Sequence, residues 1–347
     1  MIVNIIRAVC LVVFSLITYS SHTDVSAGRE EEKAYLDGLL ENKLEEYQRV
    51  YPKFTFLVLQ GGTDLVADMM TFAEVIGHEP VSLDYEHPPE LREDLIHVSA
   101  NRILQMLQYG IPSAALFKAN AQLGGQDNIC VLTINPSAIA SSPMLATENL
   151  LGMSSSFIKD IPENLLLLPE DYLAYVVDHE VYHCLQSKFI GPQPISKKEL
   201  WGDYWHYLSE LGADSYALGM HIKGKGSVTS FVTNVNRIRG TVLYTADPNH
   251  FTCGAIDQVL SIPPEEISGM SAEEVFALAV KIRNKLSISY DEYLQFMASA
   301  VEVMRLLGVK PVLGEDAAEI IIGVEPDPSR VQSMLDKSEL CLKELSG

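Results

Sequence analysis

Two histidines and a glutamate lie together in the stretch His179-Glu180-Val181-Tyr182-His183. Residues four apart on an α-helix share one face, so His179 and His183 could bind one metal ion through their ring nitrogens. Glu180 lies beside them, where its carboxylate could take a proton from a metal-bound water. This spacing is typical of zinc proteases, although a buried histidine pair that binds nothing would show the same pattern.

The surrounding residues predict the helix that this spacing requires. The segment 170–178 contains neither glycine nor proline, and Pro169 precedes it at a position that a helix tolerates. Tyr172 and Val176 fall on the same side of the helix as the two histidines, so the histidines continue an apolar stripe. We therefore expect the metal-binding face of this helix to point inward.

A catalytic zinc needs a third protein ligand, and the residues directly after His183 do not supply a further histidine. A second helix is predicted over 198–220, beyond a break rich in glycine and proline at 191–194. On this helix, Glu210 and Asp214 are again four apart and share a face. Either the two carboxylates face the metal, or they belong to a solvated acidic face.

The pattern HExxH followed by ExxAD and a further alanine resembles the gluzincin zinc metallopeptidases, which include the thermolysin-like group and the proteases that share ExxADxxA. The resemblance covers the two helices only. It implies that Glu210 is the third zinc ligand and that Asp214 accepts the free ring N–H of a ligating histidine. The small side chains of Ala213 and Ala217 would let the two helices approach closely enough for a carboxylate to reach the metal.

The resemblance also implies a tyrosine or histidine that stabilises the oxyanion. Tyr244 and His250 are candidates from the segment 241–250, and both could instead be packing or loop residues. His206 lies one turn before Glu210 on the same face, where it could be a ligand, an oxyanion donor or a surface histidine. Because the family pattern uses the glutamate as ligand, we expect His206 not to bind the metal.

Residues 1–27 have the pattern of a secretory signal peptide. Arg7 supplies a positive charge, an apolar run covers 8–19, and Val25-Ser26-Ala27 supplies the small side chains that a signal peptidase requires. The run is about twelve residues long, whereas a membrane helix needs about twenty. We therefore expect cleavage after Ala27, no stable membrane insertion and a secreted or periplasmic protein, with an uncleaved anchor as the alternative.

The chain carries a net charge of −21, and its signal segment, with one arginine and one aspartate, contributes none of it. Such acidity argues against nucleic acid and anionic lipid as partners. Residues 28–347 are long enough for one metallopeptidase domain, which could divide into lobes at 28–190 and 191–347. The stretch from 28 to about 126 could also be a pro-segment, but we favour a lobe because it lacks an evident processing boundary.

Four cysteines remain after the signal segment: Cys130, Cys184, Cys253 and Cys341. An exported protein permits disulfides, and four cysteines allow three full pairings, among which the spacing does not choose. Free buried thiols are an equal alternative in a chain of this size. Cys184 directly follows His183, but helix geometry turns it about 100° away, which favours a core cysteine over a metal ligand.

Hydrophobic periodicity predicts an α+β fold with a small N-terminal α/β lobe and a mostly helical C-terminal lobe. The resemblance to the gluzincins implies that this fold is zincin-like. Strands are predicted over 54–60 and 129–135. The second strand is the candidate for the edge strand that pairs with extended substrate in zincin folds, and an interior strand is the alternative. The other predicted segments are helices over 30–50, 64–76, 227–239, 271–286, 290–307 and 331–345, and an extended piece over 240–244.

The sequence therefore predicts an exported metallopeptidase with one Zn²⁺ per chain, Glu180 as general base and a peptide or protein as substrate. Two alternatives stay open. One is a zinc hydrolase that acts on a non-peptide amide or ester. The other is a non-catalytic exported binding protein in which the zinc stabilises the fold. No feature of the sequence predicts an oligomeric state.

Overall fold

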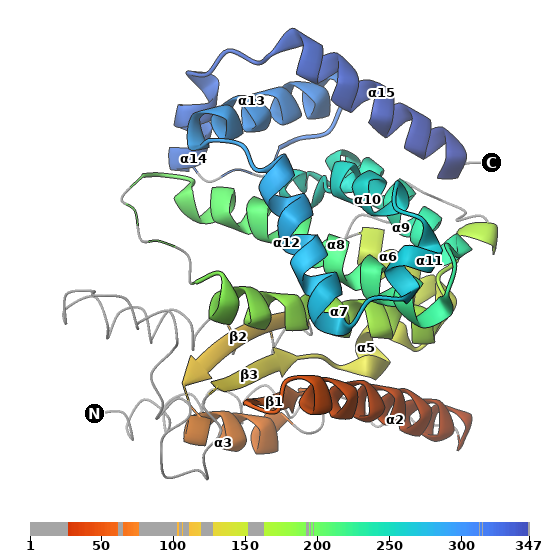
Figure 1. Ribbon diagram of the computed structural model, residues 1–347. Helices are drawn as coiled ribbons and strands as arrows, with labels where there is room; N and C mark the ends of the chain where they lie inside the picture. The colour runs from red at the N-terminus through yellow and green to blue at the C-terminus, as the bar shows by residue number, and fades with distance from the viewer. Residues whose placement is uncertain are drawn as a thin grey trace.

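The computed structural model is mostly helical, with one three-stranded sheet toward one end of the molecule (Figure 1). This confirms the α+β class. The signal segment up to residue 26 lies outside the described residues. The structure describes residues 27–61, 65–75, 103, 106, 111–118, 128–151, 163–191, 194, 196, 198–311, 313 and 315–345.

The N-terminal part provides the sheet and its flanking helices. Both predicted strands are confirmed to within two residues at each end, and a third strand, β2, was not predicted. The elements are α2 (Ala27–Val50), β1 (Phe54–Leu59), α3 (Leu65–Val75), β2 (Ser113–Lys118), β3 (Asn128–Thr133), α5 (Pro136–Ala140), α6 (Pro143–Leu151), the 3₁₀ turn η5 (Glu163–Leu165) and α7 (Pro169–Phe189).

The middle strand of the sheet is β3, which pairs in parallel with β1 and antiparallel with β2. Of the two positions that the sequence left open for this segment, the edge position is therefore wrong and the interior position is confirmed. All six residues of β3 are buried, because Cys130 and Leu132 face the main core while Ile129 and Val131 face a smaller cluster with Phe117. Burial on both faces explains why the strand has an uninterrupted apolar sequence. Among the described strands, β1 and β2 form the edges.

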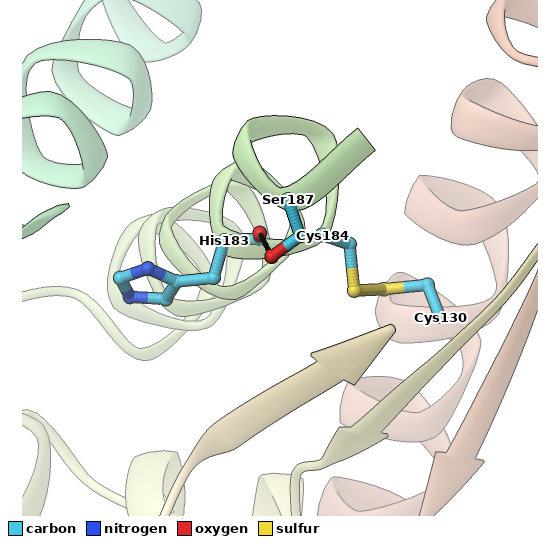
Figure 2. Close-up of a disulfide and its surroundings, with 4 residues drawn as sticks. All are labelled: Cys130, His183, Cys184 and Ser187. Atoms are coloured by element: carbon cyan, nitrogen blue, oxygen red, sulfur yellow. Dashed lines mark hydrogen bonds between the residues drawn. A yellow bond between two sulfur atoms is a disulfide. The ribbon is translucent and has the colours of Figure 1, made fainter. Parts of the chain in front are cut away.

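A disulfide joins β3 to α7 immediately beside a predicted metal ligand (Figure 2). Cys130 and Cys184 have Cα atoms 5.8 Å apart, while Cys253 and Cys341 are buried free thiols. Cys184 is turned away from His183, as the helix geometry predicted. Its sulfur is bonded to Cys130 of the sheet. The loop closed by the bond spans 54 residues, and closing such a loop stabilises a fold by about 4 kcal/mol through the unfolded chain.

The C-terminal part is helical, and two of its helices begin with capping boxes built on Ser271 and Ser289. The prediction of an extended piece over 240–244 is wrong, because this segment ends α9 and forms a 3₁₀ turn. None of the described helices is long and apolar enough to cross a membrane. The elements are α8 (Trp201–Lys225), α9 (Ser230–Thr241), η6 (Val242–Thr245), η7 (Pro248–His250), α10 (Cys253–Leu260), α11 (Pro264–Ser268), α12 (Ala272–Leu286), α13 (Tyr290–Leu306), α14 (Glu315–Ile322) and α15 (Pro328–Leu345).

The helices α7 and α8 pack against each other in the middle of the molecule, between the sheet and the C-terminal helices (Figure 1). One hydrophobic core extends from Leu36 of α2 to Met334 of α15 and includes both of these helices. It therefore runs across the boundary at 190/191 where the two lobes were predicted to meet. The two helices that carry the predicted metal ligands are therefore packed between the sheet and the C-terminal helices.

A glycine sets the closest approach between α7 and α8. A Cβ atom at Gly212 would lie 1.9 Å from the hydroxyl oxygen of Tyr182 and 2.3 Å from its Cζ atom. The Tyr182 ring is fully buried and packs against Tyr216 and Phe276, so it has no room to move aside. Ala213 and Ala217 of the ExxADxxA motif are fully buried as well.

We expect Gly212→Ala to lower the free energy of unfolding by about 1–3 kcal/mol, because the added methyl group would overlap a buried ring. It should also weaken metal binding, since α8 would be displaced from α7. Gly224→Ala on the same helix is the control: its Cβ would meet nothing within 4 Å. That control should be neutral or more stable by up to about 1 kcal/mol. Equal denaturant midpoints for the two variants would contradict this account of the interface.

Candidate metal centre

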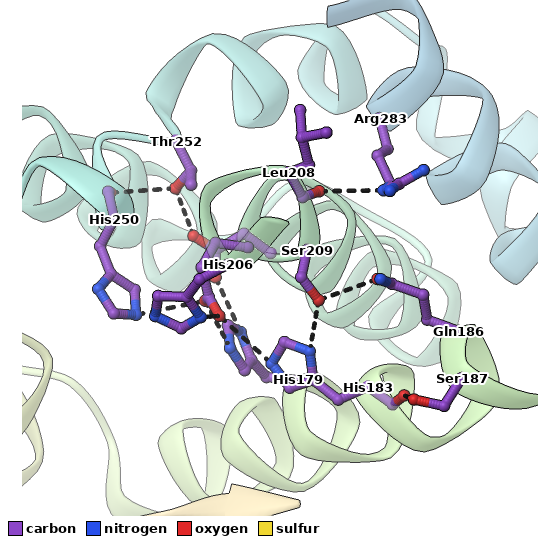
Figure 3. Close-up of polar contacts among 12 residues, drawn as sticks. His179, His183, Gln186, Ser187, His206, Leu208, Ser209, His250, Thr252 and Arg283 are labelled. Carbon is purple, nitrogen blue, oxygen red and sulfur yellow. Dashed lines mark hydrogen bonds and ion pairs between the residues drawn. The ribbon is translucent and has the colours of Figure 1, made fainter. Parts of the chain in front are cut away.

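His179 and His183 of α7 lie beside α8 (Figure 3). Both histidines face Glu210 of α8. The Nε2 atom of His179 lies 2.9 Å from Oε2 of Glu210, and Nε2 of His183 lies 3.4 Å from Oε1. Donor atoms of the three residues all lie within 4.8 Å of one another. Glu210 is thus brought next to two histidines that precede it by 27 and 31 residues in the chain, and this group could hold a metal ion.

The spacing of these donors fits zinc. Ligands about 2.0–2.1 Å from a tetrahedral zinc ion lie about 3.3 Å from one another, close to the distances observed here. Oε2 of Glu210 is buried and forms no hydrogen bond with any described residue, although Nε2 atoms of His179 and His250 lie 2.9 and 3.2 Å away. A cation would satisfy this oxygen.

The second nitrogen of each histidine is held by a polar group of α8. Nδ1 of His179 lies 3.0 Å from Oδ1 of Asp214, and Nδ1 of His183 lies 2.8 Å from Oγ of Ser209. Ser209 donates its proton to Oε1 of Gln186 at 2.9 Å, so it accepts the hydrogen bond from His183. The Nε2 lone pair of His183 is therefore directed at the metal position.

Asp214 is fully buried and surrounded by donors. Arg239 donates to it through Nε at 2.8 Å and Nη2 at 3.1 Å, and the hydroxyl groups of Tyr175 and Thr252 donate as well. Although burial opposes ionisation, Arg239 and His179 hold the pKa of Asp214 well below its usual range. Asp214 therefore stays a carboxylate and fixes the ring of His179, which is the role that the family resemblance implied.

The electrostatic field at the donor atoms favours a cation. Burial alone would lower the pKa of His179, but Glu210 and Asp214 outweigh it and raise that pKa to about 10. Burial likewise opposes ionisation of Glu210, whereas the neighbouring imidazoles, above all His179, hold its pKa well below the usual range. A divalent ion bound at this point would interact favourably with the same two carboxylates.

His206 and His250, two of the three predicted oxyanion donors, reach the same carboxylate. Nδ1 of His206 lies 3.3 Å from Oε1 of Glu210, and Nε2 of His250 lies 3.2 Å from Oε2. The other nitrogen of His250 lies 2.6 Å from Oδ2 of Asp247. Burial lowers the pKa of His250, but Glu210 and Asp247 raise it to about 9. Protonated at Nε2, His250 could donate a hydrogen bond to a substrate oxygen.

A cavity of about 770 Å³ opens onto these residues, and Glu180 lies in its wall with 7 % of its surface exposed. The wall also includes Trp205 and the start of β2, from Ser113 to Ala115. Tyr244, the third predicted oxyanion donor, is absent from the described cavity wall. It is half-buried, and burial together with the charge of Glu339 raises the pKa of its hydroxyl group.

Several residues of the site carry no signal in the sequence. Ser209 precedes Glu210 in the chain, but its contact with His183, like the contact of Arg239 with Asp214, depends on the way α7, α8 and α9 pack. Asp247 is different, because a carboxylate three residues before His250 is a local pattern that could have been noticed. The number of residues that separates Asp247 and His250 from the metal helix, however, does not show how far they lie from it in space.

Comparison with known proteins gave no match: no family model, no curated protein and no solved structure is significantly similar to this chain. The function proposed below is therefore argued from the residues, distances and charges of this chain and from the motif resemblance.

We expect Ser209→Ala to weaken zinc binding roughly 10-fold or more, because His183 loses the acceptor that orients its ring. The fold should be retained, since the hydroxyl group is small and lies at the edge of the cavity. Ser215→Ala is the matched control: this buried hydroxyl group of the same helix donates to the carbonyl oxygen of Leu211 at 2.7 Å, its only hydrogen bond among the described residues. Zinc affinities measured with a competing chelator should separate the two variants, and equal affinities would contradict the role of Ser209.

Proposed function

We propose that this chain is a zincin-like metallopeptidase that hydrolyses peptide bonds with one catalytic Zn²⁺ held by His179, His183 and Glu210. The observation that carries the proposal is the convergence of these three side chains at the wall of a large open cavity. Structural zinc sites are closed by four protein ligands, whereas catalytic sites keep a position open for water or substrate. Three ligands beside a cavity favour the catalytic type.

The roles of the protein residues follow from their positions. A zinc ion in this site would lower the pKa of a water molecule to about 7 and polarise the scissile carbonyl group. Glu180 would accept the proton of that water and later transfer it to the leaving amine. His250, with Asp247 behind it, would donate a hydrogen bond to the developing oxyanion, and His206 is the second candidate for this role.

The substrate strand would be β2 rather than β3. Ser113, Ala114 and Ala115 line the cavity, and β2 is an edge strand of the described sheet. An extended peptide could add main-chain hydrogen bonds to this edge and so present its carbonyl group to the metal ligands. The small side chains of this segment would let a peptide backbone approach closely.

The disulfide supports the proposed export. Bonds between cysteines persist in secreted and periplasmic proteins and are rare in a reducing cytosol. Cys130 and Cys184 are bonded here, and the signal-like residues 1–27 would direct the chain out of the cytosol. We therefore propose a secreted or periplasmic location for the mature protein.

The direct test is Glu180→Gln in the purified mature chain. We expect zinc content to stay near one ion per chain at limiting zinc, while cleavage of an unstructured protein such as casein falls by at least roughly 10²–10⁴-fold. The reason is that glutamine cannot accept the proton. Metal analysis and a peptide-release assay provide the two measurements.

Glu170→Gln, at the start of the same helix and away from the cavity, is the control and should cleave normally. A wild-type chain that binds no zinc would contradict the proposal outright. Zinc binding with turnover of small esters or amides, and with no peptide cleavage, would favour the non-peptide hydrolase. Zinc binding with no turnover, and loss of folding on chelation, would favour the structural zinc site.

A further inference from the structure

The four imidazole groups of His179, His183, His206 and His250 lie close together (Figure 3). All four contact the buried carboxylate of Glu210, which is more than a mononuclear zinc site uses. We propose that Glu210 bridges two metal ions, the second of which is held by His206 and His250. Because the second ion shares Glu210 with the catalytic site, this inference rests on the function proposed above. With the second ion bound, His206 and His250 would be its ligands, and the ion would take over the stabilisation of the oxyanion that these histidines would otherwise provide.

The second group of donors meets the same geometric condition as the first. Donor atoms of His206, Glu210 and His250 all lie within 4.8 Å of one another. The distances of their nitrogens from the carboxylate oxygens, 3.3 and 3.2 Å, again match the separation of about 3.3 Å between ligands of a tetrahedral ion. Imidazole and carboxylate together suit zinc or cobalt.

The two groups share only the carboxylate, and they share both of its oxygens. Oε1 contacts a nitrogen of His183 and one of His206, while Oε2 contacts His179 and His250. Each oxygen thus has one nitrogen neighbour from each group. The donors form two sets of three and not one set of five within the same distance, so a single ion bound by one set would leave the imidazoles of the other set unused.

One histidine of the second site is held by a carboxylate in the same way as one histidine of the first. Asp247 holds Nδ1 of His250 at 2.6 Å, just as Asp214 holds Nδ1 of His179 at 3.0 Å. A carboxylate behind a histidine fixes the ring and raises the basicity of its other nitrogen, which here is the one nearest Glu210.

The negative charge of the cavity wall favours a second cation. Arg239 is the one arginine or lysine of the described cavity wall, and it is already paired with Asp214. One divalent ion would not neutralise the remaining acidic side chains. Those of the described wall are Glu180, Asp203, Glu210 and Asp247.

The two ions should differ in affinity. The side chains of His179 and His183 are 9 % and 20 % exposed, whereas those of His206 and His250 are 36 % and 25 % exposed. The more exposed pair is less rigidly held and more accessible to competing water. We therefore expect the second ion to bind more weakly and to be lost first on dialysis.

The test is a Co²⁺ titration of the metal-depleted full mature chain, followed by visible absorption and by metal analysis after equilibrium dialysis. We expect two equivalents in the wild type, bound in a tight and a weaker step. His250→Ala and His206→Ala should each keep the tight step and lose the weaker one. Asp247→Asn should weaken the second step roughly 10–100-fold. His221→Gln, on α8 but outside the cavity, should keep both steps.

Circular dichroism confirms that each variant is folded before its titration is compared. A wild type that binds one equivalent, unchanged in His206→Ala and His250→Ala, overturns the second site and leaves the peptidase proposal standing. A wild type that binds no cobalt overturns both. Two equivalents that both persist in His250→Ala and His206→Ala also overturn the assignment, because the second ion would then lie elsewhere.

Discussion

The rest of the structure depends on two carboxylates that are buried on one face of α8. Glu210 and Asp214 are 1 % and 0 % exposed, and burying an ionised carboxylate is costly unless it is paired and hydrogen-bonded. Asp214 meets this condition within the protein through Arg239 and two hydroxyl groups. Glu210 is surrounded by imidazoles and keeps an oxygen without a hydrogen bond among the described residues. The unequal compensation explains why one carboxylate is a support and the other is suited to bind a cation.

The surrounding fold keeps these carboxylates opposite the histidines. Gly212 lets α8 come close to α7, and the disulfide at Cys184 ties α7 to the middle strand of the sheet. The same packing places the start of β2 in the cavity wall and His250 of η7 next to Glu210. A displacement of either helix would therefore separate the ligands and open the buried carboxylates to water at the same time.

The parts of the fold set by local sequence could be predicted, and those set by packing could not. Proline, capping serines and apolar periodicity marked most helices, and the four-residue spacing placed His179 beside His183 and Glu210 beside Asp214. The order of the strands depends on contacts between distant segments, so the sequence did not show that β3 is the middle strand of the sheet rather than an edge strand. The pairing of Cys130 with Cys184, and the approach of His250 to Glu210, depend on the same long-range packing and left no periodic signal in the chain.

The central claim is that His179, His183 and Glu210 bind one zinc ion together. The most direct measurement is a crystal structure of the zinc-loaded chain with anomalous diffraction data collected on either side of the zinc absorption edge. The account predicts a zinc peak bonded to Nε2 of both histidines and to a carboxylate oxygen of Glu210, at about 2.0–2.2 Å from each. A zinc-loaded crystal with no peak at this position, or with Glu210 turned away from the ion, would contradict it.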